Sequence, residues 1–307
     1  MSALDVVEVQ TETGIPAAAD SADPEGTYRK RRLGFWFWAS VAWLGLLLFS
    51  AVFADLLPLK DPDATFSGAS RSGPGREHWF GADNIGKDVF ARTVYGARRS
   101  LAVAGVATAF GIIMGAAVGL VAGYYRRAVD SSISAGLNIL LAIPGLVLLL
   151  TLISFLAPPG EASATAQTFW VTMALSILTI PTIARVTRAQ TMVWGDRDFV
   201  MASRTLGARN KRIIIREIFP NVVPTLISFA FTLLAALIII EAALAFFGIG
   251  DVSGVSWGIM IQNGRAQLER SPHMVLFPAI FMFLTIIALN FVGDQLRTRF
   301  DVRESGI

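Results

Sequence analysis

The sequence predicts an all-α integral membrane protein with six transmembrane helices and with both termini inside the cell. Hydrophobic residues fill 54% of the 307 positions and charged residues only 16%, and the mean hydropathy is +0.58. Such a composition is typical of a chain that spans a membrane. Lys and Arg also concentrate in segments that face the cytoplasm on this topology.

Composition excludes several classes of site. The chain has no cysteine, which excludes disulfides, thiolate metal sites and a Cys nucleophile. Its two histidines, His78 and His273, have no companions at ligand spacing, so we expect no metal site. We can assemble no Ser-His-Asp set within the spans and expect no catalytic residues. The basic residues flank apolar runs, so no nucleic-acid partner is expected.

Residues 1–32 are predicted to form a disordered acidic tail that ends in a basic stop. The first 28 positions hold six acids and no Lys or Arg, with Pro, Ala, Ser and Thr between them. Too few large apolar residues are present to bury a core. Because a signal peptide begins with a short basic segment, we expect this tail to precede an uncleaved first helix at 33–57.

Six apolar runs approach the ~20 residues that a spanning helix needs. The first is 33–57, and the other five lie in a predicted core at 99–294. Pro144 predicts a kink or a packed bend in the third run, and Pro181 interrupts the fourth. The five runs in the core are 101–124, 133–156, 169–186, 222–247 and 274–292.

Lys and Arg set the predicted orientation. They cluster at 29–32, 126–127, 185–216 and in a C-terminal tail at 295–307, all of them cytoplasmic if the N-terminus is inside. The extracytoplasmic loop at 58–98 is polar and rich in Gly and Pro. Its second half is expected to form a short helix on the outer surface.

The stretch Gly81-Ala-Asp-Asn-Ile-Gly86-Lys87-Asp88 comes within one residue of a phosphate-binding loop. Asp88 stands where that motif has the Ser or Thr that binds Mg²⁺, and no strand is predicted before it. We therefore expect no ATP site here and no cofactor in this chain.

Two features inside the spans have both a structural and a functional interpretation. Gly111, Gly115, Gly119 and Gly123 share one helix face, which favours tight static packing over a sliding surface. Glu241 is the one acid well inside an apolar run, where an unpaired charge costs about 2.5–3.5 kcal/mol. A structural role is favoured for it over a proton or substrate site.

The polar bridge Asp196–Asn221, between the fourth and fifth runs, is the most informative segment. Apolar residues at helical spacing predict a cytoplasmic helix at 199–216 that offers its apolar side to a soluble partner. Such a helix can also rest on anionic lipid. Gly207 and its small neighbours favour a protein groove. The bridge carries six basic residues: Arg197, Arg204, Arg209, Lys211, Arg212 and Arg216.

Several motifs follow one another along the chain: 78–101, Met201-Ala202-Ser203 with Gly207, Ile213 and Phe219-Pro220-Asn221, then 241–250, Ser256-Trp257-Gly258 and 290–301. In these motifs the chain resembles the inner-membrane permeases of ABC importers, in particular the second permease subunit of the dipeptide/oligopeptide family. In that family the cytoplasmic loop usually opens Glu-Ala-Ala, whereas Met201 and Ser203 fill the first and third places here.

The resemblance implies a type I ABC importer permease fold and a non-catalytic subunit in the bacterial inner membrane. It implies a sister permease, two ABC ATPase subunits that bind ATP and Mg²⁺, an extracytoplasmic solute-binding protein and a peptide substrate. Nickel chelates, glutathione or another small solute are alternative cargoes, and an ion-coupled secondary transporter is the less favoured class.

The resemblance also implies roles for particular residues. The ATPase-coupling residues are Met201, Ala202, Ser203, Leu206, Gly207 and Ala208. Phe219, Pro220 and Asn221 would form an elbow after the coupling helix, and Glu241, Phe247 and Gly248 would form a gate or a packing contact.

Overall fold

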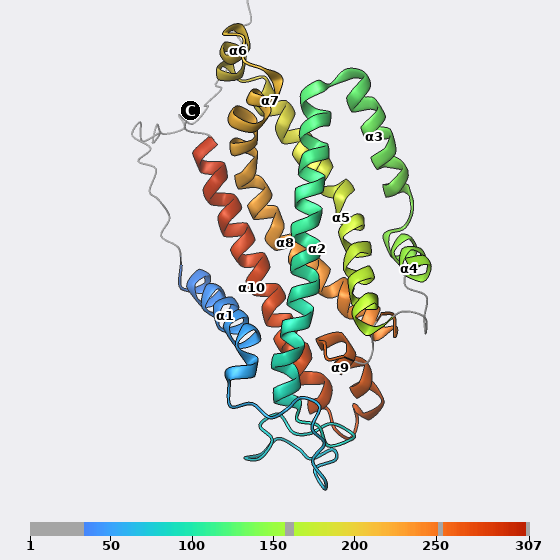
Figure 1. The fold of residues 1–307 in the computed structure, drawn as a ribbon. Helices are drawn as coiled ribbons and strands as arrows, with labels where there is room; N and C mark the ends of the chain where they lie inside the picture. The colour runs from blue at the N-terminus through green and yellow to red at the C-terminus, as the bar shows by residue number, and fades with distance from the viewer. Residues whose placement is uncertain (1–33, 157–162, 251–253, 305–307) are drawn as a thin grey trace, which may run out of the picture. The chain divides into compact units, whose positions relative to one another are not determined.

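The computed structural model describes residues 34–156, 163–250 and 254–304 (Figure 1). The predicted acidic tail at 1–32 lies outside the described residues. The described part of the chain is helical with irregular connections, and its only β pairing is an isolated bridge between Ala82 and Asp88. The predicted all-α class is confirmed.

Five helices are long and apolar enough to cross a membrane, and a bent helix pair makes six if it counts as one span. The predicted number of spans agrees with this count. The five are α1 (Phe35–Val52), α2 (Val89–Tyr125), α5 (Ala164–Gly195), a helix over Asn210–Phe246 that contains α8 (Phe219–Phe246), and α10 (His273–Glu304).

The bent pair consists of α3 (Arg127–Ala142) and α4 (Gly145–Leu156), which meet at 89°. Pro144 causes the break, because it has no N–H and forces extended backbone on the residue before it. Ile143 is extended, with φ −80° and ψ 127°, and α4 starts where Leu148 N donates to Pro144 O at 3.0 Å. The bend predicted at Pro144 is confirmed.

The closest helix contact joins α2 to α5. A Cβ added at Gly119 would lie 2.5 Å from the Ala184 carbonyl oxygen, and one at Gly115 would lie 2.6 Å from Ile183 Cβ. Real Cβ atoms do not approach so closely, so these glycines let the two backbones touch. The close contact supports the static interpretation of the glycine face. α5 also continues through Pro181, where the sequence predicted an interruption.

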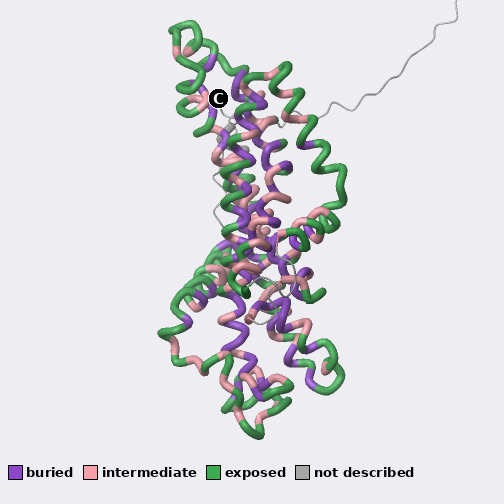
Figure 2. The backbone as a smooth tube through the Cα atoms, turned by 45° about the vertical axis from the view of Figure 1, so that its right-hand side comes forward, coloured by how far each residue is buried: buried purple, intermediate pink, exposed green. Residues whose placement is uncertain are grey.

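α8 lies between α2 and α10, and the short helix α9 (Trp257–Gly264) closes one end of this group. Trp257 is fully buried there, and its Nε1 donates to Thr93 O at 3.0 Å. α1 packs on α10, where Trp43 Nε1 donates to Thr285 Oγ1 at 3.2 Å. Buried positions run along these packed helices, and the end that carries residues 198–209 is largely exposed (Figure 2).

The prediction of a short surface helix within 58–98 is wrong. Residues 57–88 are irregular, and α2 begins at Val89 and continues without a break into the apolar run. Asp88 causes the early start, because its Oδ1 accepts from Ala91 N at 2.8 Å and caps the helix. Residues 89–98 are therefore the first turns of the second span.

The stretch Gly81–Asp88 is a closed turn, not a phosphate cradle. Asp83 Oδ1 accepts from the backbone N–H groups of Ile85 at 2.9 Å and Lys87 at 2.8 Å. A phosphate-binding loop presents such amides to its ligand, whereas here the carboxylate of Asp83 takes them. Gly81 and Gly86 adopt φ of 79° and 87°, which glycine tolerates without strain.

An ion pair within this loop and a hydrogen bond from α2 hold the loop in place. Lys87 Nζ donates to Asp63 Oδ1 at 2.8 Å and thereby holds the pKa of the Asp63 carboxyl below its usual value. Arg92, which is buried on α2, donates to Pro62 O at 2.9 Å. The loop therefore has a fixed position on the start of the second span.

We expect Asp88→Ala to weaken this end of the protein. Asp88 caps α2 and also accepts from His78 Nδ1 at 2.7 Å, and both side chains are buried. Losing a cap costs about 0.5–2 kcal/mol, and leaving a buried polar partner unpaired costs about 1–3 kcal/mol. The apparent melting temperature of the purified complex should fall. The exposed Asp61→Ala is the control, and equal melting of the two variants would contradict the assignment.

The boundary predicted at residue 294 is also wrong. α10 continues to Glu304, so residues 295–304 prolong the last span as a helix, and 305–307 lie outside the described residues. Thr298 Oγ1 donates to Asp294 O across this position at 2.9 Å. Residues 295–304 include no Pro or Gly, and polar residues alone do not end a helix.

Candidate coupling site

Hydrogen bonds from Arg126 hold the start of the bridge between the fourth and fifth spans. Asp196 directly follows α5, and its Oδ1 accepts from Arg126 at 2.7 Å. Arg126 joins α2 to α3 and also donates to Met192 O at 3.2 Å. The ends of three helices therefore meet where the bridge leaves the bundle.

The first part of the bridge is α6 (Asp198–Thr205). Asp198 in its first turn and Arg204 in its last both complement the helix dipole. Its inner face is anchored by Val200, which is fully buried in a cluster with Ile213 and Ile218. α6 is thus packed onto the start of the helix that becomes the fifth span.

α6 ends at Thr205 and the chain turns at Gly207, so the predicted single helix over 199–216 is wrong. Gly207 N donates to Arg204 O at 2.9 Å, Ala208 N donates to Ser203 O at 3.1 Å, and Gly207 adopts φ 79°. These bonds form a Schellman motif, which ends a helix with a residue of positive φ. The hydrophobic pattern continued past Gly207, but the backbone turns there.

A second helix follows at once and runs without a break into the fifth span. It comprises α7 (Asn210–Arg212), a π-helical stretch η2 (Ile213–Ile218) and α8. Pro220 lies just after the π stretch, has no N–H to donate and crowds the carbonyl four residues earlier. The wider π turn accommodates this local defect.

The structure places the predicted elbow within this helix. Phe219 and Pro220 are exposed, and Asn221 Nδ2 donates to Glu217 O at 2.6 Å. The helix is continuous across all three residues, so they form no elbow between separate elements. The irregular backbone lies at Ile213–Ile218 instead.

The six predicted coupling residues lie together at one end of the described chain (Figures 1 and 2). Leu206 is 88% exposed and Met201 is 50% exposed. Ala202 and Gly207 are exposed, whereas Ser203 and Ala208 are half-buried. We call these residues, 201–203 and 206–208, the coupling tip. A leucine this exposed beside other apolar surface is typical of a contact with a partner.

Aromatic residues that the site prediction missed hold the coupling tip in place. Tyr124 Oη donates to Asn210 Oδ1 at 2.9 Å, and the Arg204 guanidinium lies 5.1 Å from the Tyr124 ring centroid. Arg197 lies over Trp194 at 5.4 Å. Both distances are within the range of cation–π attraction. Tyr124 ends the apolar run predicted at 101–124, which was the available signal for it, whereas Trp194 lies beyond the run at 169–186 and had none.

The bridge also presents positive charge. All six of its basic residues are exposed: Arg197, Arg204, Arg209, Lys211, Arg212 and Arg216. A charged rim around an exposed apolar centre is the usual composition of a protein–protein contact. The same charges can attract anionic lipid headgroups.

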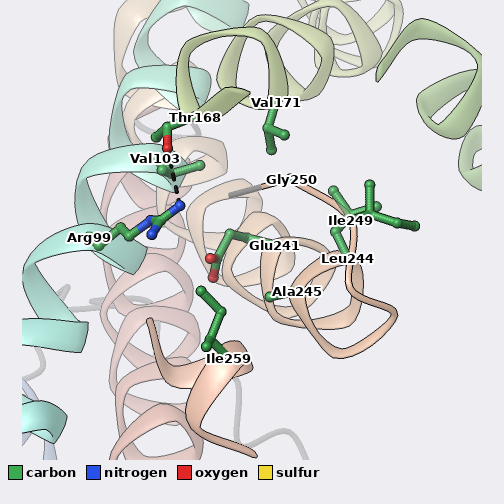
Figure 3. A pocket seen from close by; sticks show the side chains of 10 residues that line it. All are labelled: Arg99, Val103, Thr168, Val171, Glu241, Leu244, Ala245, Ile249, Gly250 and Ile259. Carbon is green, nitrogen blue, oxygen red and sulfur yellow. Dashed lines mark hydrogen bonds between the residues drawn. The ribbon is translucent and has the colours of Figure 1, made fainter. Parts of the chain in front are cut away.

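The predicted gate residues lie at the far end of α8. Glu241 is buried, accepts from Ser100 Oγ at 3.1 Å and is also hydrogen-bonded by Ser256. Phe247 is 65% exposed, and Gly248 forms a second Schellman turn, with φ 76°. Glu241 thus joins α2, α8 and Ser256, the residue before α9. Figure 3 shows its side chain directed into a pocket that Arg99 also lines. The structure does not bring it near the coupling tip.

Comparison with known proteins identifies the family of the chain. Residues 98–305 match the binding-protein-dependent transport system inner membrane components. The dipeptide transport system permease protein DppC of Alkalihalophilus pseudofirmus is 34% identical over 267 residues, which cover 85% of each chain. The glutathione transport system permease protein GsiD of Escherichia coli O6:K15:H31 is also 34% identical over 267 residues, covering 85% of this chain and 84% of its own.

Solved structures share the fold. An inward-facing structure of the MetNI methionine ABC transporter aligns with a TM-score of 0.56 at 22% identity, covering 67% of this chain and 95% of its own. An amino acid ABC transporter aligns with a TM-score of 0.52 at 17% identity, covering 68% and 94%. The ABC permease fold and the non-catalytic role that the sequence predicted are confirmed. The chain belongs to the family of binding-protein-dependent transport system inner membrane components and is a permease subunit of an ABC importer.

Proposed function

We propose that this chain is one of two permease subunits of an ATP-driven importer of di- or short oligopeptides in the bacterial inner membrane. The curated relatives named for dipeptide and glutathione transport support a peptide-like cargo. The observation that carries the coupling role is the exposure of Leu206, at 88%, on a tip whose backbone is fixed by a Schellman motif.

The proposed partners follow from the surfaces that the chain leaves open. A cytoplasmic ATPase subunit would receive the coupling tip in a groove, and each of two permeases would engage one ATPase. The sister permease and lipid would cover the apolar residues of α3 and α4, of which Ile139 is 68% and Phe155 82% exposed. An extracytoplasmic binding protein would deliver the solute at the end that carries residues 57–88 and α9.

ATP and Mg²⁺ belong to the ATPase subunits in this proposal. The one stretch of this chain that resembles a phosphate loop has its amides bonded to Asp83, which supports that assignment. The chain would supply half of the translocation pathway and the mechanical link to hydrolysis.

The packing suggests how that link works. Val200 of α6 is buried against Ile213 and Ile218, and the helix that contains them continues as α8 to Phe246. A displacement of the coupling tip by ATPase closure would therefore be carried along α8 to the far end, which bears Glu241. Such a rigid element can bias the pathway between inward- and outward-facing states.

Uptake into proteoliposomes tests this function. The complete complex with its binding protein should take up labelled Ala-Ala in a manner that requires ATP and is blocked by vanadate. Glutathione and a nickel chelate are the competing cargoes, and uptake of either one without Ala-Ala would reject the peptide assignment. Vanadate-resistant uptake driven by an ion gradient would reject ATP coupling.

A further inference from the structure

α3 has one polar flank and one apolar flank, on either side of the face that it packs against the bundle. It contacts α2 and α5 at the edge of the described helices (Figure 1), and Leu137 is buried there. Asn138 and Leu140 lie on opposite flanks, about 160° apart on a helix of 3.6 residues per turn. The flank of Asn138 also carries Ser131 and Ser134, whereas the flank of Leu140 carries Val129 and Ile133.

Hydrogen bonds continue the polar flank onto α5. The Arg185 guanidinium of α5 donates to Asn138 Oδ1 at 2.7 Å, and both residues are exposed. Nearer the start of α3, Arg188 Nη2 donates to Asp130 Oδ2 at 2.6 Å. Ser134 Oγ donates to Asp130 Oδ1 at 3.1 Å. A row of hydrogen-bonding side chains therefore runs along this side of α3 and α5.

This row lies at the depth of the hydrocarbon. α3 and α4 make one span if the bent pair counts as one, and α3 starts at Arg127, on the cytoplasmic side in the predicted topology. Asn138 lies roughly 16 Å along the helix from Arg127, and the hydrocarbon is about 30 Å thick. Polar and charged side chains at such a depth face a bundle interior or a water-filled cavity, because lipid cannot bond them.

The break between α3 and α4 gives an independent reason against lipid. Ile143, Pro144 and Gly145 are all exposed. The last carbonyls of α3 have no partner within the helix, and Pro144 has no N–H to supply one. Non-helical backbone at membrane depth is tolerated only where protein buries it or where it lines a water-filled cavity.

Water satisfies the polar flank better than a second protein surface would. Arg185 is charged, and Asn138, which accepts from it, brings no opposite charge. Charged residues are depleted from the cores of protein–protein contacts, because burying a charge without a counter-charge is costly. Water leaves the Arg185 guanidinium solvated.

We propose that the polar flank of α3, together with Arg185, lines the water-filled pathway through which the cargo passes. The apolar flank around Leu140 would then face lipid or the sister permease. A peptide in transit keeps its amides and charged ends hydrogen-bonded to water and to such a wall, so it avoids the cost of an unpaired polar group. This inference rests on the proposed function, because it locates the transport pathway on this chain.

Thiol reactivity tests the assignment. The chain has no native cysteine, so Asn138→Cys and Leu140→Cys each place a single thiol on one flank. The permease–ATPase complex in nanodiscs is treated with a charged methanethiosulfonate, and modification is followed by the mass of this chain. The reaction is run without nucleotide and after trapping with ATP and vanadate. Because the reagent attacks the thiolate, which forms in water, Asn138→Cys should react at least about tenfold faster than Leu140→Cys in one of these states.

A second thiol and an uptake measurement complete the test. Thr182 is exposed on α5, one turn from Arg185. Thr182→Cys should react as fast as Asn138→Cys, and it decides the test if Asn138→Cys fails to assemble. Modified Asn138→Cys should lose ATP-driven uptake of Ala-Ala, because the bulky cation then occupies the pathway. The parent complex, treated in the same way, should keep it.

Equal rates for Asn138→Cys and Leu140→Cys in both states, while Ala-Ala uptake proceeds, would overturn the pathway assignment and leave the proposed function standing. An unreactive Asn138→Cys that a short bifunctional reagent cross-links to the sister permease would also overturn it, since protein would then cover the polar flank. Failure of Ala-Ala uptake by the untreated parent complex would count against the proposed function itself.

Discussion

Gly207→Asp is expected to abolish uptake and substrate-stimulated ATP hydrolysis while the complex still assembles. Gly207 adopts φ 79°, which most L-residues adopt only with strain, and it is exposed beside Leu206. A Cβ at this position meets nothing within 4 Å, so the bundle has no reason to unfold. The new carboxylate would lie at the centre of the proposed contact, where an unpaired buried charge costs about 3–5 kcal/mol.

Gly207→Asn is the control for this prediction. Asparagine tolerates positive φ and can end a helix in a Schellman motif, so this variant keeps the turn and adds no charge. We expect it to retain most uptake, measured in the same proteoliposomes. Normal transport by Gly207→Asp, or equal loss in both variants, would contradict the docking role of the coupling tip.

Gly119→Ala is expected to prevent stable packing of α2 on α5. Its Cβ would lie 2.5 Å from Ala184 O and 2.6 Å from Thr187 Cβ. The nearest of these atoms belongs to the backbone of α5, which cannot rotate away as a flexible side chain can. The two helices would therefore have to move apart. Overfilling a tight core commonly costs about 1–3 kcal/mol, and we expect a value at or above the top of that range. The yield of complex in the membrane and its apparent melting temperature should both fall.

Gly105→Ala on the same helix is the control, and we expect it to have the opposite effect on stability. A Cβ there meets nothing within 4 Å, and alanine is favoured over glycine in a helix by about 1 kcal/mol. This variant should be as stable as the parent protein or slightly more so. Equal behaviour of the two variants would show that the glycine face does not hold α2 against α5.

The sequence anticipated the features that depend on local composition. Apolar length located the spans, since about 20 residues must cross the hydrocarbon. The glycine spacing along 111–123 indicated a close helix contact, though not that α5 is the partner, and Pro144 indicated the bend. A missing side chain and a missing N–H both act locally. Gly207 was also singled out, although its effect on the backbone was underestimated.

Other features depend on contacts that composition does not reveal. Apolar periodicity continues from Phe199 to Ile218, yet the Schellman turn divides this stretch, because the burial of Val200 against Ile213 and Ile218 requires the chain to reverse. α2 begins at Val89, ten residues before the predicted core boundary at 99, because Asp88 caps it through a single hydrogen bond. Polar residues at 295–304 remain helical because nothing breaks the helix.

The site at the far end illustrates the same limit. Glu241 was recognisable in the sequence as an acid within an apolar run. Its neighbours Arg99 and Ser100 come from a helix about 140 residues earlier, where Ser100 lies 141 positions from Glu241. Arg99 showed no pattern of its own, because it comes to line the same pocket as Glu241 only after α2 and α8 pack side by side.

The account depends most directly on where Leu206 lies in the cell. Leu206→Cys would carry the only thiol of this chain, at a position that is 88% exposed in the isolated chain. In intact cells an impermeant thiol reagent should leave it unmodified, and in inside-out vesicles a short bifunctional reagent should cross-link it to the ATPase subunit. Ready modification from outside intact cells would contradict the topology and the coupling role together.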